Sequence, residues 1–411
     1  MAFDPFQRDF GNSAKYAEII IGSAEKKWHN IRSECGDNGM TYNHELQDWP
    51  SFTWKDETLS ALLADVRHRQ GLLIGRMESL GFKLREESVL HSLTEEVVKS
   101  SDIEGERLNK DQVRSSIARK LGMDVAGMVR SDRDVDGVVE MMIDATQKYS
   151  EPLTKRRLCG WHAALFPTGH SGMSKITVSS WRTDESGPMQ VVSGPMGRET
   201  VHYEAPAAER LPEEMKAFLK WFGSDKKIDP VLVAGIAHLW FVTIHPFDDG
   251  NGRIARAITD LALARSESSP QRFYSMSSTI RANRKEYYDV LERTQKGGLD
   301  ITKWLEWFLN CLKGAFDQAG ETLSSVLAKA DFWDRHRDTQ LNDRQRQMIN
   351  RLLDGFVGKL TSSKWAKLTK TSQDTAARDI DDLIKKGVLI RGPAGGRSTS
   401  YELVLTRKEC L

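Results

Sequence analysis

The sequence has few cysteines, no long apolar run and almost no net charge, and each absence argues against a class of protein. The four cysteines are widely scattered and form no C-x-x-C motif, so we expect reduced thiols rather than a disulfide framework or a zinc site. No apolar run approaches the roughly 18 residues of a transmembrane helix, and the first residues lack the basic and apolar regions of a signal peptide. A formal net charge of +1 over 411 residues gives no overall attraction to nucleic acid or membranes. We therefore expect a cytoplasmic protein with no membrane partner.

The most informative stretch, residues 245–256, reads His-Pro-Phe-Asp-Asp-Gly-Asn-Gly-Arg-Ile-Ala-Arg. Apolar segments on both sides, at 231–243 and 257–263, indicate that it is a loop between two helices. Gly250 and Gly252 allow backbone conformations in which successive N–H groups turn inward around an anion. A helix that starts near Arg253 would direct its positive dipole end to the same anion. The stretch therefore predicts a phosphate site.

Side chains of this loop supply the groups that nucleotide transfer needs. Asp249 can hold Mg²⁺, which prefers carboxylate and phosphate oxygens together with waters. Arg253 and Arg256 lie three residues apart, so that both can reach one anion from the same helix face. Histidine ordinarily titrates near neutral pH, so we expect that His245 can deprotonate a hydroxyl. A lone histidine or a Gly-Asn-Gly turn is usually structural, but the number of specified positions in register here makes a chance match implausible.

The loop resembles the Fic family signature, H-x-F-x-[D/E]-G-N-G-R-x-x-R, at all eight specified positions: His245, Phe247, Asp249, Gly250, Asn251, Gly252, Arg253 and Arg256. The resemblance implies a helical core that moves AMP from ATP onto a protein hydroxyl. It implies that the histidine is the base, that the phenylalanine anchors the loop, and that the aspartate binds Mg²⁺. It further implies that the Gly-Asn-Gly residues cradle the phosphates while the two arginines hold the outer ones.

An upstream segment, residues 99–106, has the sequence of a helix end that is stopped by a glycine. Beside the loop it resembles the inhibitory motif of the Fic family, [S/T]-x-x-x-E-[G/N], with Ser100, Glu104 and Gly105 in the matching positions. The resemblance implies that Glu104 pairs with Arg256 and occupies the charge that would hold the γ-phosphate. Breaking a buried ion pair costs roughly 3–5 kcal/mol, which suffices to keep an enzyme mostly inactive. We expect Glu106 to face elsewhere on the helix.

Residues 174–206 depart from the helical pattern around them. The β-prone runs 176–178, 189–192 and 200–203 are separated by Gly-Pro turns and predict a hairpin that projects from the helices. The hairpin resembles the Fic flap, which docks the segment carrying the target hydroxyl as an added strand. We expect its docking edge to be Met189, Gln190, Val191 and Val192. An ordinary surface hairpin is the alternative.

The whole chain predicts a mainly α protein, with a Fic helical core and a β-hairpin flap between a helical N-terminal domain and a C-terminal winged helix-turn-helix. The expected parts are an extension, with disorder as one alternative, at 1–40, the N-terminal domain with the inhibitory helix at 41–125, the core at 126–335 and the winged helix at 336–411. One amphipathic helix should close at Gly81, and the next should begin near Glu87. Asn283 and Tyr288 resemble Fic positions that line the base and sugar, although core packing explains the tyrosine equally well.

In the winged region, Arg391 and Arg397 flank the wing, where phosphate contacts would lie. The predicted recognition helix, residues 373–386, nevertheless carries Asp374, Asp379, Asp381 and Asp382 against three basic residues, and this net acidity disfavours reading of the major groove. DNA is therefore an alternative partner that we do not favour. A protein-docking or dimerisation module is the other interpretation, and a homodimer stays open.

These observations predict a nucleotidyltransferase that transfers AMP from Mg·ATP to a Ser, Thr or Tyr hydroxyl of a target protein or of itself, with Glu104 holding it inactive. One alternative is a Fic-type transfer of another phosphate-containing group, or the removal of AMP. An alternative from another class is a DNA-binding transcriptional regulator. No residue identifies the target protein.

Overall fold

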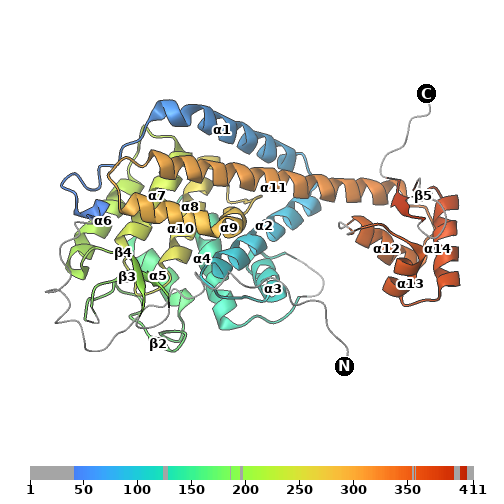
Figure 1. Ribbon diagram of the computed structural model, residues 1–411, viewed down its shortest axis with the longest axis horizontal. Helices are drawn as coiled ribbons and strands as arrows, with labels where there is room; N and C mark the ends of the chain where they lie inside the picture. Colours follow the sequence, from blue (N-terminus) through green and yellow to red (C-terminus); the bar gives the residue numbers. More distant parts are fainter. Residues whose placement is uncertain are drawn as a thin grey trace. The chain divides into compact units, whose positions relative to one another are not determined.

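The computed structural model describes residues 41–123, 128–185, 187–194, 198–353, 356, 358–392 and 399–404, so the expected extension at 1–40 lies outside the described chain. Two compact units form, Met1–Ala319 and Gly320–Leu411. Helices dominate both units and the strands are short, which confirms the mainly α prediction (Figure 1). Among the described residues, no helix is long and apolar enough to cross a bilayer.

The centre of the first unit is the pair α7 (Pro230–Ile244) and α8 (Asn251–Glu267), which pack against each other and carry the loop of residues 245–250 between them (Figure 1). Asp229 caps the start of α7 by accepting the N–H of Val231 at 2.8 Å. Almost every residue of α7 is buried, as expected for a helix that is apolar on all sides. The loop is therefore held between two helices that cannot shift independently of the core.

Other helices surround this pair. The helices α4 (Arg133–Gln147) and α5 (Lys155–Leu165) pack on α8, while α6 (Leu211–Gly223) packs on α7. The first part of α11 (Thr302–Arg335) contributes Trp304, whose indole N–H donates to the Gly235 carbonyl at 2.8 Å. The helix α10 (Arg284–Gln295) follows the short α9 (Met276–Ala282). Two single turns, η1 (Asn43–Glu45) and η2 (Ala208–Arg210), complete the helices of this unit together with α1 to α3.

The N-terminal helices are α1 (Asp56–Glu78), α2 (Phe82–Ile103) and α3 (Lys110–Leu121). The predicted boundary between the first two was wrong. The helix α1 ends before Ser79, and Gly81 is the N-cap of α2, which begins at Phe82 rather than near Glu87. Gly81 has extended backbone angles, φ −60° and ψ 153°, which suit an N-cap and not the left-handed stop that we expected. The helix α2 packs on α9 and thus lies beside the core.

The predicted hairpin forms from β3 (Gln190–Ser193) and β4 (Thr200–Glu204), which pair antiparallel with a register shift between Val191 and Val192. The run at 176–178, however, is not a strand. Instead, β1 (His170–Ser171) pairs with β2 (Ser174–Lys175) in a separate ribbon just before it. One further hydrogen bond, from Ile176 N–H to Gly169 O at 3.1 Å, follows this ribbon.

The second unit contains α12 (Asp343–Leu353), α13 (Ser362–Thr369), α14 (Gln373–Lys385), β5 (Leu389–Arg391) and β6 (Tyr401–Leu403). Its core gathers Phe332, Met348, Trp365, Ile380 and Leu389. Lys370, with φ 52°, turns the chain between α13 and α14. Residues 393–398, with Arg397, lie outside the described chain, so the wing and the winged helix-turn-helix stay predictions.

The acidity of α14 is smaller than its sequence indicates. Three of its four aspartates form ion pairs within the second unit: Asp379 with Arg344, Asp381 with Arg391, and Asp382 with Lys386. Asp379 is buried, so its charge does not face solvent. These pairs neither favour nor exclude DNA, which stays an alternative partner.

Gly137→Ala and Gly160→Ala test how closely α4 and α5 must pack. A Cβ atom at Gly137 would lie 1.8 Å from the backbone oxygen of Ala164 on α5, whereas one at Gly160 would meet no atom within 4 Å. We expect Gly137→Ala to lower the free energy of unfolding by about 1–3 kcal/mol, because backbone must move. The exposed Gly160→Ala should raise it by roughly 0.5–1 kcal/mol, because alanine favours helix. Calorimetry of the full chain measures both, and equal effects would contradict the packing.

Candidate active site

The helix α7 ends at His245, which adopts the left-handed conformation, φ 52° and ψ 59°. A residue with a Cβ atom adopts this backbone conformation at an energetic cost, and only where the surrounding structure enforces it. The His245 N–H donates to Phe241 O at 3.0 Å and closes the helix end. The loop that follows therefore leaves α7 in a fixed direction.

Two contacts hold the loop in the core. Phe247 is fully buried, and its ring stacks on His162 with centroids 4.2 Å apart and planes 7° apart. Asn251 accepts the Phe247 N–H at 3.0 Å and donates its amide to Phe247 O at 2.7 Å. Both polar ends of the Asn251 side chain are thus used to close the loop. If Asn251 contacts a phosphate as predicted, its backbone at the start of α8 would do so, because its side chain is already bonded to Phe247.

The start of α8 has the geometry of an anion site. Gly250 is the N-cap, with φ 80°, and a Cβ atom there would lie 2.9 Å from the ring of Phe166. The first N–H groups of any helix have no partner within the helix and point outward with the positive end of its dipole. A Cβ atom at Gly252 would lie 2.1 Å from Glu104 Oε1. The Glu104 carboxylate therefore rests directly on the glycine surface of the predicted phosphate cradle.

The two arginines of the loop are almost fully buried, with side chains 3% exposed at Arg253 and 2% at Arg256. Arg256 donates to Ser100 Oγ at 2.8 Å, to Ser100 O at 2.8 Å and to Glu104 Oε1 at 2.7 Å. Each guanidinium also has one buried nitrogen without a hydrogen-bond partner among the described residues. These nitrogens are Nε of Arg253 and Nη1 of Arg256. An anion larger than a carboxylate would supply more acceptors than α2 does.

Glu106 faces the loop, which corrects the expectation that it faces elsewhere on a helix. The helix α2 ends at Ile103, and Gly105 takes φ 88° while the Glu106 N–H bonds back to Ser101 O at 3.0 Å. This reversal is typical of a helix that ends in a left-handed glycine. The Glu106 carboxylate then reaches Arg253 Nη1 at 2.5 Å. Burial raises the pKa of Glu106, and the adjacent Arg253 offsets this only in part.

His245 lines a cavity of about 130 Å³ and is held there as a neutral base. Its Nδ1 lies 3.1 Å from Val242 O, and because a carbonyl can only accept, Nδ1 carries the proton. The lone pair of Nε2 is therefore available. Burial lowers the pKa of His245 to about 4, so the ring is uncharged at neutral pH. Such a ring can accept a proton from a hydroxyl.

Most predicted site residues line this cavity or lie directly behind it. The residues that line it are Glu104, Met189, Gln190, Val191, Val192, His245, Asp249, Asn251, Gly252 and Tyr288. Asn283 is not among them. Its side chain is exposed and donates to Thr279 O at 3.0 Å, because a residue between α9 and α10 bonds locally instead of reaching the cavity. The predicted contact of Asn283 with the nucleotide has no geometric support.

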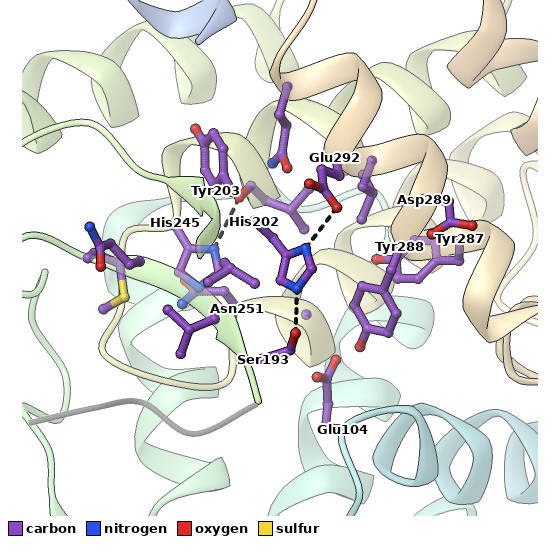
Figure 2. Close-up of a pocket in the computed structure, with 18 of the residues that line it drawn as sticks. Glu104, Ser193, His202, Tyr203, His245, Asn251, Tyr287, Tyr288, Asp289 and Glu292 are labelled. Atoms are coloured by element: carbon purple, nitrogen blue, oxygen red, sulfur yellow. Dashed lines mark hydrogen bonds and ion pairs between the residues drawn. The ribbon is translucent and has the colours of Figure 1, made fainter. Parts of the chain in front are cut away.

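Sequence reasoning missed several lining residues. Ser193, His202 and Glu292 line the cavity and bond to one another (Figure 2). Tyr287 also lines it, and its hydroxyl contacts His238 Nε2 at 2.8 Å. The neighbouring Tyr288 hydroxyl is buried without a protein partner among the described residues, which suits a polar atom of a ligand. Only the paired tyrosines gave any signal in the sequence.

Asp249 is the candidate metal ligand. Its carboxylate accepts the Ser171 hydroxyl and the Gly250 N–H, both at 2.5 Å, and its side chain is 28% exposed. Within the described part of the chain, no three metal-binding side chains come together. A single carboxylate next to a phosphate cradle nevertheless fits Mg²⁺, which commonly takes one or two carboxylates with substrate phosphates and waters. The donor set is thus compatible with the predicted ion.

Comparison with known proteins gives the same assignment for the loop. Residues 152–263 match the Fic/DOC family, and residues 42–123 match a domain of unknown function (DUF4172). A protein adenylyltransferase Fic of Nematostella vectensis is 34% identical over 116 residues, which are 27% of this chain and 25% of that protein. Protein adenylyltransferase fic-1 of Caenorhabditis elegans is 29% identical over 166 residues, 40% of this chain and 30% of that protein. The chain thus matches less than a third of the length of either relative.

A likeness to a solved structure extends further along the chain. A Fic family protein from Desulfovibrio desulfuricans G20 superimposes with a TM-score of 0.49 and 23% identity, over 86% of this chain and 98% of that one.

Acid should destabilise the folded chain through its buried histidines. Burial lowers the pKa of His162 and His245 to about 4 and that of His238 to about 3, whereas an unfolded histidine titrates near 6.5. Between these values the unfolded chain binds more protons, so we expect the free energy of unfolding to fall as pH drops from about 6.5 to about 4. Each histidine contributes at most about 1.4 kcal/mol per pKa unit. Denaturant unfolding across this range measures the slope.

The variant His238→Gln should flatten that slope, because one buried imidazole no longer resists protonation. His68→Gln, on the exposed face of α1, is the control for removing a histidine. A slope in His238→Gln as steep as in the parent chain would show that this histidine does not contribute.

Proposed function

Because the chain contains a Fic domain, we propose that it is a protein adenylyltransferase, which transfers AMP from ATP to a Ser, Thr or Tyr hydroxyl of a target protein or of itself, and that Glu104 inhibits it at rest. One observation carries the proposal. A neutral histidine, a glycine-framed helix start and two buried arginines meet beside one cavity. Relatives that carry the name protein adenylyltransferase support the same activity.

The cavity residues divide the chemistry among them. Phosphates of ATP bind the N–H groups at the start of α8, and Arg253 and Arg256 hold their outer oxygens. Nε2 of His245 takes the proton from the target hydroxyl, whose oxygen attacks the α-phosphorus. The bond from that phosphorus to the bridging oxygen breaks, and pyrophosphate leaves. Asp249 and the phosphates would hold Mg²⁺, which would supply positive charge against the charge that develops.

The end of α2 supplies the inhibition. Glu104 takes the Arg256 contact and lies over Gly252, while Glu106 takes the Arg253 contact. Each carboxylate thus occupies an arginine that would otherwise hold phosphate. Because Glu104 has a 22% exposed side chain and Glu106 a 44% exposed one, solvent weakens the second pair more. Glu104 is therefore the main inhibitory group and Glu106 an auxiliary one.

The hairpin is the target-docking flap of this proposal. The strand β3 pairs with β4 along one edge, and no other described strand pairs with its second edge. Such an edge can add a strand from another chain by main-chain hydrogen bonds. The residues of β3 also line the cavity, so an added strand would bring its hydroxyl towards His245.

Labelling with ATP tests the activity. The parent chain, Glu104→Gln and Glu104→Gln/His245→Ala are incubated with α-labelled ATP and Mg²⁺, together with a cell extract as a source of targets. We expect label on extract proteins with Glu104→Gln alone, because only this chain has a free Arg256 and the intact base for an external hydroxyl. Intact mass should show the addition of an adenylyl group. Equal label with the parent chain would contradict the proposed inhibition by Glu104. If none of the chains became labelled although they bind ATP, the proposed adenylyltransferase activity would be wrong.

Nucleotide affinity separates the two carboxylates. We expect the ATP dissociation constant to fall by about tenfold or more in Glu104→Gln, because a buried ion pair no longer competes. In Glu106→Gln it should fall by roughly two- to fivefold, because that pair is partly exposed. Glu87→Gln, which breaks the Arg114 ion pair elsewhere on α2, is the matched control and should change nothing. Calorimetric titration measures each constant, and an unchanged value in Glu106→Gln would exclude its auxiliary role.

A further inference from the structure

Three side chains that the transfer reaction does not use form a chain of hydrogen bonds in the same cavity. Ser193 is the last residue of β3, His202 lies on β4, and Glu292 lies on α10. The Ser193 oxygen lies 2.5 Å from His202 Nε2, and His202 Nδ1 lies 2.8 Å from Glu292 Oε2. Figure 2 shows the His202 ring between the other two side chains.

The direction of these bonds follows from the carboxylate. Burial raises the pKa of Glu292, but hydrogen bonds from Lys296 and His202 outweigh burial and hold it below its usual value. Glu292 is then ionised near neutral pH and can only accept, so Nδ1 of His202 carries the proton. Nε2 consequently accepts the Ser193 hydroxyl. This order, hydroxyl to imidazole to carboxylate, is the arrangement that activates a serine as a nucleophile.

The surroundings indicate which electrophile such a serine would meet. The cavity that contains Ser193 is also lined by His245, Asp249 and Gly252. The last of these belongs to the anion cradle at the start of α8. A structural tie between the hairpin and α10 would explain the His202–Glu292 contact, but it would not require Ser193 to bond to the same imidazole in a cavity that Gly252 also lines. The electrophile that this cavity is suited to hold is a phosphorus atom.

We infer that Ser193 is an acceptor of AMP, so that the chain adenylylates its own flap. This inference rests on the proposed adenylyltransferase activity. His202 Nε2 takes the Ser193 proton, and the Ser193 oxygen forms a bond to the α-phosphorus of ATP. The bond from that phosphorus to the bridging oxygen breaks, pyrophosphate leaves, and Glu292 stabilises the imidazolium until its proton passes to solvent. The product is a phosphodiester between Ser193 and adenosine.

The modification would act on the flap itself. Ser193 belongs to β3, the strand whose free edge is the docking edge of the proposed function. An adenylyl group on Ser193 removes the hydroxyl proton that His202 accepts and fills part of a cavity of about 130 Å³. A modified chain therefore has less room for an external hydroxyl beside His245.

Peptide mapping after incubation with Mg·ATP tests the inference in the Glu104→Gln chain. We expect one adenylyl group on Ser193, no label at that peptide in Ser193→Ala, and recovery of label in Ser193→Thr. His202→Gln and Glu292→Gln should slow self-labelling by about a hundredfold, as the loss of a general base does. Thr200→Ala is the matched control, because Thr200 is the exposed hydroxyl residue opposite Ser193 in the hairpin, and it should label normally.

Two further readouts separate catalysis from hairpin stability. The ATP dissociation constant should stay unchanged in His202→Gln and Glu292→Gln, and the rate per chain should not depend on chain concentration. Label on extract proteins or on other residues of the chain, without label on Ser193, would overturn this inference and leave the adenylyltransferase proposal standing. A complete absence of protein-bound label would overturn both. Labelling of Ser193 at parental rates in His202→Gln would remove the role of the relay.

Discussion

The contact of Arg256 with the end of α2 is the interaction on which the site depends. Its guanidinium is almost fully buried and therefore needs an anionic partner, since a buried ion pair that loses one member costs roughly 3–5 kcal/mol. At rest, Ser100 and Glu104 supply that partner. A nucleotide phosphate would supply it in the active state. On the proposed function, inhibition and substrate binding would use the same arginine, and ATP would have to displace Glu104 from it.

The loop can present this arginine because the packing beneath it is rigid. Phe247 stacks on His162 of α5, and Gly137 lets α4 approach the Ala164 backbone of the same helix closely. Asn251 then closes the loop on itself. These apolar and backbone contacts fix where His245 and the start of α8 lie before any ligand binds. Catalytic groups held in this way need little rearrangement to meet a substrate, which is how preorganised sites stabilise charge.

The contiguous motif was predicted from its residues and the distant Glu104–Arg256 pair through the family resemblance, whereas other contacts between distant segments were missed. The motif from His245 to Arg256 is contiguous, and its glycines, histidine and arginines lie as one loop and one helix start. The contact of Glu106 with Arg253 joins residues 147 positions apart. It depends on the left-handed conformation of Gly105, and a prediction that continues the helix past Ile103 therefore places Glu106 on the wrong side. His202 and Glu292 lie 90 positions apart on a strand and a helix. Asn283 stays a prediction of the resemblance alone, since its exposed side chain donates locally to Thr279 O.

The cavity is lined by two imidazoles, His245 and His202, and each is suited to a different acceptor hydroxyl. His245 bonds to a neutral carbonyl and burial lowers its pKa, so it holds a proton weakly and returns it readily. His202 bonds to a carboxylate, which stabilises the imidazolium that forms when a hydroxyl is deprotonated. Among the described residues, no hydroxyl bonds to Nε2 of the first ring, so that ring is open to an external hydroxyl, whereas the second ring already bonds to Ser193. An external strand on β3 and the Ser193 hydroxyl would therefore compete for the same α-phosphorus. On the proposed function, the release of Glu104 would decide when ATP binds, and occupancy of the flap would decide which hydroxyl receives AMP.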